Sequence, residues 1–404
     1  MRIVVVSDTA RISGGAEKVA LTAALALAQR GIETTVLTGV GPVDERLQNV
    51  ENLTVENTGQ TAFYDVPSRL QGIRQVLWNG VAAERMASIL KRHDPKDTVV
   101  HFHSYLKVLS GSTLAAALDA GFRVVVTLHD YGLACPNMGF YNYQSHEICR
   151  LKPMSLSCVT TNCTLRGRTN KLGFVARAAV LNRRVRWRDR IRHFVAVSQS
   201  SGEIMRPFLH PEAKVHLVLN PVDLEKLDPV PVSQNKPLLY VGRLEAHKDP
   251  MALAAAAKEV GMPVVFVGDG PVRDEVAAIN PDAEITGWVS PDEVHRRQRE
   301  ARALVMPSRW YEGAPLVIFD ALAAGLPVVV GDINCGHEFV AHGKTGLIFS
   351  PYETGSLARE LSKLKDDALV ASMGKAAFDR FWAAPPTMDK HIEGLLAVYE
   401  QALA

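Results

Sequence analysis

Short apolar runs rich in valine and isoleucine recur along the chain and alternate with longer stretches suited to helices. The runs are IVVVS at 3, TTVLT at 34, TVVHF at 98, RVVVTL at 123, HFVAVS at 193, LLYVG at 238, VVFVG at 264, ALVMPS at 303 and PVVVG at 327. They lack the alternation of apolar and polar residues found in a strand with one solvent-exposed face. They therefore indicate parallel strands that helices cover on both sides. Most intervals are long enough for a crossover helix, which predicts a doubly wound α/β fold.

This pattern occurs twice, and a proline-rich stretch separates the two occurrences. Residues 219–237 contain four prolines and few large apolar residues, as expected of a linker. A chain of 404 residues suits two domains. We therefore predict a first domain over 1–222 and a second over 223–386. An amphipathic helix over 387–404 either closes the second domain or packs back on the first.

The net charge and the N-terminal sequence indicate which binding partners and which cellular compartment to expect. The formal net charge is +2, so the chain as a whole offers no electrostatic reason to bind nucleic acid. The opening MRIVVVSD predicts a strand and not a signal peptide, and no run of about eighteen apolar residues could span a bilayer. These features predict a soluble cytoplasmic protein.

Glycines follow the first strand run. Gly14 and Gly15 precede a helix rich in Ala and Leu that ends near Gly31. Glycines at such a turn let the backbone approach a ligand, and the helix N-terminus offers N–H groups to phosphate or sugar oxygens. The alternative is a tight turn that needs a positive φ.

Histidines stand at the ends of two strand runs. His129 and Asp130 follow RVVVTL, and His101 and His103 lie in HFHSY. Ligand-contacting residues gather at the carboxyl ends of strands in open α/β sheets. We therefore predict that His129 is functional, with a structural histidine at a strand end as the alternative. His101 and His103 fit a functional or a structural role equally.

Two cations follow the strand run at 238. Arg243 and Lys248 lie five positions apart in GRLEAHKD, directly after Gly242. Such a pair suits a diphosphate. Arginine can donate two parallel hydrogen bonds to it, and lysine can neutralise it as a point charge. The alternative is a surface pair bridged to Glu245 or Asp249.

The stretch EGAPLVIFDALAAG, which begins at Glu312, carries two acids in an otherwise apolar run. Gly313, Ala314 and Pro315 predict an open helix N-terminus, with Pro315 at the first helical position, where the helix dipole favours an anion. Asp320 lies further along the helix, where a buried carboxylate needs donors such as the two hydroxyls of a ribose. Glu312 precedes the helix and could reach a sugar beyond a diphosphate. The alternative leaves both acids solvated.

Taken together, these motifs resemble the family-4 retaining glycosyltransferases (glycosyl transferases group 1) of the GT-B fold. The resemblance covers essentially the whole chain, and the ordered set of motifs is specific although each motif is short. The motifs are SGGAE at 13–17, TLHD at 127–130, NPVD at 220–223, GRLEAHKD at 242–249, GDGP at 268–271, EGAPLVIFD at 312–320, AAGLPVV at 323–329 and GHEFVAHGKTGLIF at 336–349.

The resemblance implies two Rossmann-like domains that face each other across a cleft, the first holding most of the acceptor and the second a nucleoside diphosphate sugar. It implies that His129 lies near the transferred sugar, that Arg243 and Lys248 stabilise the leaving diphosphate, and that Glu312 contacts the donor sugar. Further donor-binding positions implied by the resemblance are Gly14, Gly15, Gly242, Gly313, Ala314, Leu316, Val317, Asp320 and Glu338.

One position departs from the family pattern. The usual second glutamate is Asp320 here. Because its side chain is one methylene shorter, it would have to bind ribose from a shifted backbone or through water. A lower donor affinity or an altered nucleotide preference is expected, but not inactivity.

The resemblance also implies transfer with retention of anomeric configuration, without a metal or any cofactor besides the donor, in the synthesis of cell-surface polysaccharide or glycolipid. No DxD motif stands where a metal-bound diphosphate would need one, and Arg243 with Lys248 can supply the positive charge. The alternatives are another GT-B activity, such as an epimerase or a phosphorylase, and a non-catalytic subunit that binds sugar nucleotides.

A strongly basic segment covers residues 166–192. It carries ten Lys or Arg residues and one acid, Asp189, with Phe174, Leu181 and Trp187 among its apolar residues. A basic helix with an aromatic residue can rest on anionic lipid and bring the site to a lipid-linked acceptor. The alternative is a solvated face or a contact between subunits. Nucleic acid is not expected, because the patch is short and has few aromatics.

Four cysteines, Cys135, Cys149, Cys158 and Cys163, bracket a long insertion after TLHD. A loop of this length needs a cross-link or a bound ligand to stay ordered. Its aromatic residues could line an acceptor pocket. A structural zinc ion and unmodified thiols are equally compatible with the spacing. Disulfides are less favoured because the expected compartment is reducing.

Overall fold

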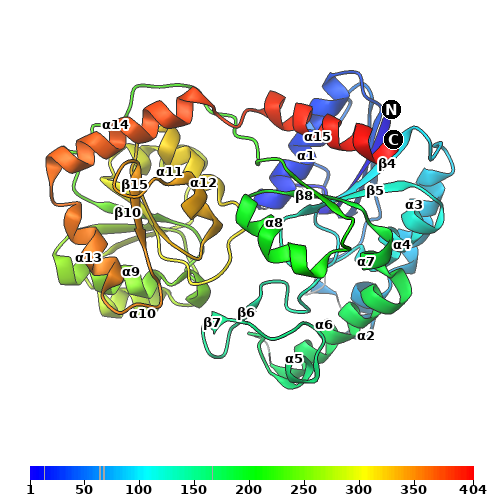
Figure 1. Ribbon diagram of the computed structural model, residues 1–404, viewed down its shortest axis with the longest axis horizontal. Helices are drawn as coiled ribbons and strands as arrows, with labels where there is room; N and C mark the ends of the chain where they lie inside the picture. The colour runs from blue at the N-terminus through cyan, green and yellow to red at the C-terminus, as the bar shows by residue number, and fades with distance from the viewer. Residues whose placement is uncertain (13, 63–64, 67–68, 166) are drawn as a thin grey trace. The chain divides into compact units, whose positions relative to one another are not determined.

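The computed structural model describes residues 1–404 except 13, 63–64, 67–68 and 166 (Figure 1). The described residues form two compact units, and each unit is described by itself. Unit 1 comprises Met1–Phe140, Arg150–Pro221 and Pro386–Ala404, and unit 2 comprises Tyr141–Cys149 and Val222–Pro385.

Seven parallel strands form one sheet in the described part of unit 1, in the order β3-β2-β1-β4-β5-β8-β9. These strands are β1 (Arg2–Thr9), β2 (Thr34–Val40), β3 (Leu53–Asn57), β4 (Thr98–Phe102), β5 (Arg123–Leu128), β8 (His193–Ala196) and β9 (Lys214–Leu217). The β4 strand is buried along its whole length, as the uninterrupted apolar runs predict for a central parallel strand.

The helices of unit 1 connect and cover these strands. They are α1 (Gly15–Gln29), α2 (Arg69–Leu77), α3 (Gly80–Leu90), α4 (Ser110–Asp119), α5 (Leu156–Thr160), α6 (Arg168–Val180), α7 (Trp187–Arg190), α8 (Gln199–Met205) and α15 (Met388–Leu403). The last helix, α15, packs against α1, β4 and β5 (Figure 1). Its residues Ile392, Leu395 and Tyr399 are buried in the same cluster as Leu27 of α1. The C-terminal helix is thus part of unit 1.

Unit 2 contains a second parallel sheet, with six strands in its described part in the order β12-β11-β10-β13-β14-β15. The strands are β10 (Leu238–Val241), β11 (Val264–Val267), β12 (Glu284–Gly287), β13 (Ala303–Met306), β14 (Val328–Gly331) and β15 (Gly346–Phe349). The helices are α9 (Pro250–Val260), α10 (Arg273–Ile279), α11 (Pro291–Arg299), α12 (Leu316–Ala323), α13 (Ser356–Lys363) and α14 (Asp367–Ala383). Both units are therefore α/β and doubly wound, as predicted.

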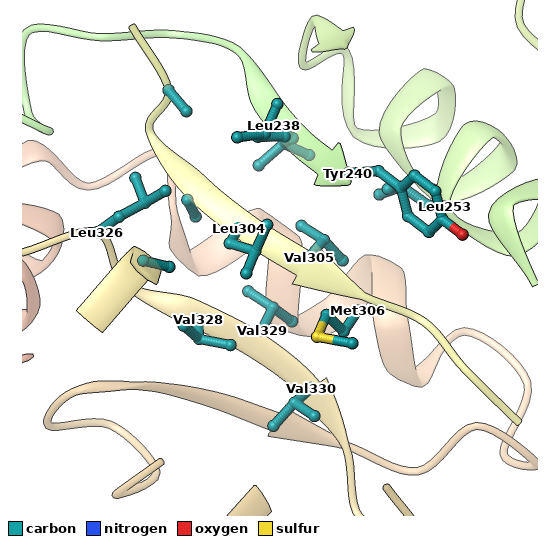
Figure 2. Close-up of a cluster of buried hydrophobic side chains, with 14 of the residues drawn as sticks. Leu238, Tyr240, Leu253, Leu304, Val305, Met306, Leu326, Val328, Val329 and Val330 are labelled. Carbon is teal, nitrogen blue, oxygen red and sulfur yellow. The ribbon is translucent and has the colours of Figure 1, made fainter. Parts of the chain in front are cut away.

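The core of unit 2 lies where the central strands meet their covering helices. Figure 2 shows Leu304 and Val305 on β13 beside Val329 on β14, with Leu238 on β10 and Leu253 on α9 in the same cluster. All five side chains are fully buried. Burial of a side chain of this size contributes about 1.5–3 kcal/mol, so the core fixes the strand ends from which the candidate site residues extend.

A short hairpin within the cysteine-rich insertion belongs to unit 2. Strands β6 (Tyr141–Asn142) and β7 (Glu147–Ile148) pair antiparallel. The backbone N–H of Ile148 donates to the Tyr352 hydroxyl over 3.2 Å. The predicted first domain, 1–222, runs through this segment, whereas the contacts of the segment assign it to the second unit. Its chain position alone could not reveal this, because the assignment depends on long-range contacts.

The basic segment 166–192 does not form one helix, and Arg166 lies outside the described residues. It divides into α6, a π-helical turn over Leu181–Val185 and α7. Trp187 is buried and donates to Asn182, so the aromatic residue expected to rest on lipid is part of the core. Over the part of the chain that the structure describes, we find no helix with the length and apolarity that a bilayer span requires.

Candidate active site

The loops after β10 and β13 carry most of the predicted donor-site residues. The two strands are neighbours in the sheet, but the chain leaves β10 toward β11 and reaches β13 on the other side. This is a topological switch point, where open α/β sheets bind ligands beyond the carboxyl ends of their strands. The sequence thus places Arg243 and Lys248 on one loop and Glu312 on the other.

Lys248, which is partly exposed, forms an ion pair with the buried Glu312. The Lys248 Nζ atom lies 2.9 Å from Oε1 of Glu312, and the Ser308 hydroxyl donates to the same oxygen over 2.9 Å. Glu312 is 8% exposed. Burial raises the pKa of the Glu312 carboxyl, but the charge and hydrogen bond of Lys248, with other hydrogen bonds, bring it below its ordinary value. Glu312 is therefore an anion at neutral pH.

Arg243 pairs with Glu245, which His247 also contacts. Arg243 Nη1 lies 2.9 Å from Glu245 Oε1, and His247 Nε2 lies 3.2 Å from Glu245 Oε2. Burial lowers the pKa of His247 to about 4, aided by the charge of Lys248, so this imidazole is neutral at pH 7 and donates through Nε2. The His247 ring meets Trp310 edge to face at 4.6 Å. These contacts fix the loop that presents both cations.

Glycines let the loops after β10 and β11 approach each other closely. A Cβ at Gly268 would lie 2.0 Å from the Gly242 carbonyl oxygen, and one at Gly270 would lie 2.3 Å from the Leu244 carbonyl oxygen. Gly242 also has φ +150°, a conformation that favours glycine. The GRLEAHKD and GDGP motifs are therefore coupled by backbone contact, which supports the position of Arg243.

The N-terminus of α12 follows Glu312 as expected, with one correction. Pro315 is the N-cap of α12, so the helix begins at Leu316, one residue later than predicted. Pro315 has ψ 115°, and this extended backbone keeps it out of the first turn. Gly313, Ala314, Leu316 and Val317 are all half-buried around this end of the helix.

The two remaining acids of the predicted donor site lie near the same helix. The sequence predicted a buried carboxylate at Asp320, but the structure shows it half-buried on α12. The helix presents this position at the margin of the core. Glu338 is half-buried on a short 3-10 helix over Cys335–Phe339. A Cβ at Gly336 would lie 2.2 Å from Cδ1 of Ile318, so this 3-10 helix packs closely on α12.

The predicted residues of unit 1 lie at the start of α1 and at the ends of β4 and β5. Gly14 is the N-cap of α1, which begins at Gly15, whereas residue 13 of the SGGAE motif lies outside the described residues. His129 follows β5, and its Nε2 lies 2.9 Å from Nδ1 of His103. Burial lowers the pKa of His129 to about 3. Whether any of these residues touches donor or acceptor stays a prediction.

Two models of known families match the chain. One, described as Glycosyltransferase Family 4, matches residues 13–226, which is more than half of the 404 residues. The chain belongs to glycosyltransferase family 4. The other, described as Glycosyl transferases group 1, matches residues 235–367, which cover most of unit 2. The predicted family is confirmed.

Relatives of this family-4 chain align over only part of it. The alpha-D-kanosaminyltransferase of Streptomyces kanamyceticus is 30% identical over 141 residues, which are 32% of this chain and 36% of the relative. The UDP-Gal:alpha-D-GlcNAc-diphosphoundecaprenol alpha-1,3-galactosyltransferase of Escherichia coli is 27% identical over 188 residues, 40% of this chain and 48% of the relative. The chain thus spans less than half the length of either relative.

Solved structures resemble the whole chain. Sucrose-phosphate synthase from Thermosynechococcus elongatus has a TM-score of 0.72 at 17% identity and covers 99% of this chain and 98% of its own. Anabaena HepE in complex with UDP and glucose has a TM-score of 0.69 at 17% identity, with coverages of 99% and 100%. The likeness shows the fold, so this family-4 chain has the predicted GT-B architecture of two Rossmann-like units.

Sequence reasoning does not select several residues that the structure places at the site. Ser308 and His247 lie in the runs ALVMPS and GRLEAHKD, but their hydrogen bonds depend on loop conformation. Glu245 is expected from the sequence only as a partner in a surface pair, and it does bind Arg243. His103 fits a functional or a structural role by sequence, and its contact with His129 follows from β4 and β5 being neighbours. The sequence does carry a signal for this contact, because both histidines directly follow apolar runs that predict strands.

A structural zinc ion, one of the two alternatives equally compatible with the cysteine spacing, is not supported. No cluster of three or more potential metal ligands occurs in the part of the chain that the structure describes. Cys163 and Cys158 instead surround the buried Lys171, whose Nζ lies 3.2 and 3.9 Å from their sulfur atoms. Cys149 belongs to unit 2, whereas Cys135, Cys158 and Cys163 belong to unit 1. None of the five cysteines forms a disulfide.

Proposed function

We propose that the chain is a retaining, metal-independent glycosyltransferase. It moves a sugar from a nucleoside diphosphate sugar to a saccharide or lipid-linked acceptor in the synthesis of cell-surface polysaccharide or glycolipid. The observation that carries the proposal is the ion pair of Lys248 with the buried Glu312 at the switch point of unit 2, in a chain of family 4. Unit 2 binds the donor in this account, and unit 1 binds the acceptor.

The two cations are held in place but keep donors for a diphosphate. Arg243 gives one short contact to Glu245, and its side chain is 61% exposed. A guanidinium has five N–H donors and an ammonium has three, so each cation retains donors beyond its ion pair. Because the carboxylates fix the cations beforehand, little reorganisation is needed when charge develops on the leaving diphosphate.

The acids around α12 take the roles that the resemblance implies. Glu312 contacts hydroxyls of the donor sugar, and Asp320 accepts from the ribose. Gly313, Ala314, Leu316 and Val317 surround the helix end that receives the phosphates, together with Gly242, and Glu338 lines the donor site nearby. The half-buried position of Asp320 supports this role, because a ligand can reach a carboxylate that the core does not cover.

The reaction follows from this arrangement. The bond between the anomeric carbon and the diphosphate oxygen breaks, and its electron pair stays on the diphosphate, which Arg243 and Lys248 neutralise. The acceptor hydroxyl attacks the oxocarbenium-like carbon from the same face, and its proton passes to the departing phosphate. The configuration is retained, and no protein nucleophile is required. His129 lies near the transferred sugar, and Gly14 and Gly15 contact donor phosphate or sugar.

The names of the relatives support the substrate classes. The Escherichia coli relative is named for UDP-Gal and a diphosphoundecaprenol-linked acceptor, and Anabaena HepE was solved with UDP and glucose. These substrates belong to those proteins. They favour a nucleotide-sugar donor with a saccharide or lipid-linked acceptor here, without choosing the sugar or the base.

A donor screen followed by turnover tests the proposal. The chain is incubated with a panel of UDP- and GDP-sugars, and a donor present at 100 times its Kd should stabilise it by about 2.7 kcal/mol. With that donor and a matching acceptor, Lys248→Ala and Glu312→Ala should abolish transfer. Lys375→Ala removes a lysine from an exposed ion pair with Asp379 and should leave transfer unchanged.

The products separate the alternatives. Donor consumed only in the presence of acceptor supports transfer. Donor isomerised without acceptor would indicate an epimerase, release of sugar phosphate from a glucan would indicate a phosphorylase, and donor binding without turnover would indicate a non-catalytic subunit. Full transfer by both unit 2 variants would contradict the assignment of the site.

We also propose that unit 1 makes a peripheral contact with anionic membrane on the cytoplasmic side through segment 166–192 and its neighbours. Leu156 and Leu172 are 80% and 62% exposed, on α5 and α6, which pack together. Arg168 and Arg183 lie in the same region, and Arg183 is exposed. Exposed leucines beside cations suit a bilayer surface, where each cation adds about 1 kcal/mol.

Sedimentation with phosphatidylcholine vesicles, with or without phosphatidylglycerol, tests this contact. The chain should sediment only with the anionic vesicles, and Leu156→Asp with Leu172→Asp should weaken that binding. Equal binding to both vesicles, or no effect of the two substitutions, would contradict the contact.

A further inference from the structure

We propose that His103 is a positioning residue for His129, fixing which ring nitrogen of His129 carries the proton and which is left to a ligand. The inference rests on the proposed function, in which His129 lies near the transferred sugar. It goes beyond that function because it assigns a role to a second histidine.

The fold brings the two rings together. His103 directly follows β4 and His129 directly follows β5, and these strands are neighbours with Phe102 opposite Val126. Nδ1 of His103 lies 2.9 Å from Nε2 of His129, and the rings stack at 5.2 Å with 28° between their planes. The contact is thus set by the register of the central strands of unit 1.

His103 itself is held firmly. It is 6% exposed, and its backbone N–H donates to the Val6 carbonyl over 3.0 Å, which ties it to β1. The His101 ring lies against it at a centroid distance of 4.1 Å. His101 is fixed in turn by a contact of 2.7 Å to the Thr127 hydroxyl. A side chain anchored on this many sides can hold its neighbour in one orientation.

Because both rings are neutral, the contact between them links their tautomers. Burial lowers the pKa of His103 well below the usual value, aided by His101 and His129, and burial lowers the pKa of His129 to about 3. Both imidazoles are therefore neutral at pH 7, and each carries one N–H. A hydrogen bond between them needs an N–H on one nitrogen and a lone pair on the other, so the state of Nε2 of His129 is coupled to that of Nδ1 of His103. In either direction of this hydrogen bond Nδ1 of His129 has the state opposite to Nε2, and it is the ring nitrogen outside the contact with His103.

Substitutions at His103 separate hydrogen bonding from packing. His103→Phe keeps an aromatic ring but removes Nδ1. His103→Asn keeps a polar atom near the Nδ1 position, and His103→Gln places its polar atoms further out, near the Nε2 position. Tyr399→Phe is a matched control, because it removes a buried hydrogen bond from His101 without touching the contact between His103 and His129.

The first measurement is a long-range ¹⁵N–¹H NMR spectrum of the full chain labelled with [¹⁵N]histidine, in which a His129→Gln sample assigns the His129 signals. Wild type and Tyr399→Phe should show one His129 tautomer, and His103→Phe should show a mixture or the other tautomer. A single unchanged tautomer in His103→Phe would overturn the inference. This readout needs no donor, so it stands apart from the proposed function.

The second measurement is steady-state transfer. His103→Phe should lower kcat by roughly 10- to 100-fold, as expected of a misplaced group, with little change in the donor KM. His103→Asn should recover most of the rate, and His103→Gln should not. Equal rates in all three variants would overturn the positioning role, whereas a wild-type chain without transfer would contradict the proposed function alone.

Discussion

A carboxylate buried as deeply as that of Glu312 is stable only while its partners remain. Lys248 supplies the opposite charge and Ser308 a hydrogen bond, both to the same oxygen. Loss of one member of a buried ion pair leaves the other charge unsatisfied, which typically costs about 3–5 kcal/mol. The pair therefore contributes to stability as well as to the proposed chemistry, and the two contributions can be measured separately.

Lys248→Met should lower the free energy of unfolding more than the double variant Lys248→Met with Glu312→Gln, because the double variant leaves no buried charge unpaired. Urea denaturation of the wild type, both single variants and the double variant gives the coupling energy, which should be about 1–3 kcal/mol. Transfer should be lost in all three variants. Additive effects on stability would show that the two side chains do not interact.

Asp320 is the position where the chain departs from the family pattern, and the longer side chain can be restored. Asp320→Glu should lower the donor KM with little effect on kcat, because the carboxylate then reaches the ribose without a shifted backbone. Initial rates over a range of donor concentrations measure both constants. Asp320→Asn, which keeps the length but removes the charge, is the control and should raise the KM. A higher KM in Asp320→Glu would contradict the ribose role.

At the scale of elements, the sequence predicted the interior of both parallel sheets but not their margins. The nine apolar runs all coincide with strands, whereas the other described strands of these sheets, β3, β9, β12 and β15, lie at the sheet edges. An edge strand has one neighbour and more contact with solvent, as the mixed burial of β3 and β9 shows. Its sequence therefore need not be a continuous apolar run.

The same contrast holds for the candidate site. Motifs placed Arg243 and Lys248 after a strand and Glu312 ahead of a helix correctly, because chain position determines which end of a parallel sheet a loop occupies. The contacts of Glu312 with Lys248 and Ser308 could not be predicted, because side-chain pairing depends on loop conformation. Cysteine spacing left a structural zinc ion and unmodified thiols equally open for the same reason, because it does not specify that Lys171 contacts Cys158 and Cys163.

Gly270→Ala tests the backbone contact that supports the cation loop. Its Cβ would lie 2.3 Å from the Leu244 carbonyl oxygen, and backbone can yield only by moving the loop that carries Arg243 and Lys248. Donor affinity, measured by isothermal titration calorimetry, should fall at least about tenfold, equal to a loss of about 1.4 kcal/mol.

Gly343→Ala is the control for this variant. Gly343 has φ +73°, and the methyl group of an alanine there would meet nothing within 4 Å, so the variant tests backbone strain without a steric contact. Its donor affinity should match that of the wild type. An equal loss of affinity in both variants would show that general destabilisation, and not displacement of the cation loop, causes the effect.

At the scale of the whole molecule, buried neutral histidines make stability depend on pH. Burial lowers the pKa of His101, His103 and His129 in unit 1 and of His247 in unit 2, to about 3 for His129 and about 4 for His247. Because the folded pKa values lie below the unfolded value of about 6.5, the unfolded chain binds more protons below that pH. Stability is therefore fully present above pH 6.5 and declines as the pH falls toward 4 and 3.

Thermal unfolding between pH 8 and pH 4 should show this decline. The Tm should change little from pH 8 to 7 and then fall by several degrees between pH 6.5 and 4.5. His247→Gln, which removes one of the depressed groups, should flatten that part of the curve. A Tm that rises on acidification through this window would contradict neutral buried histidines.

The most direct test of the whole account is an NMR time course of the reaction, with the donor chosen by the screen and the anomeric proton of the product resolved. Donor should be consumed only when acceptor is present, and the product should have the same anomeric configuration as the donor, with no reaction in Lys248→Ala. An inverted product, or equal conversion by Lys248→Ala, would contradict it.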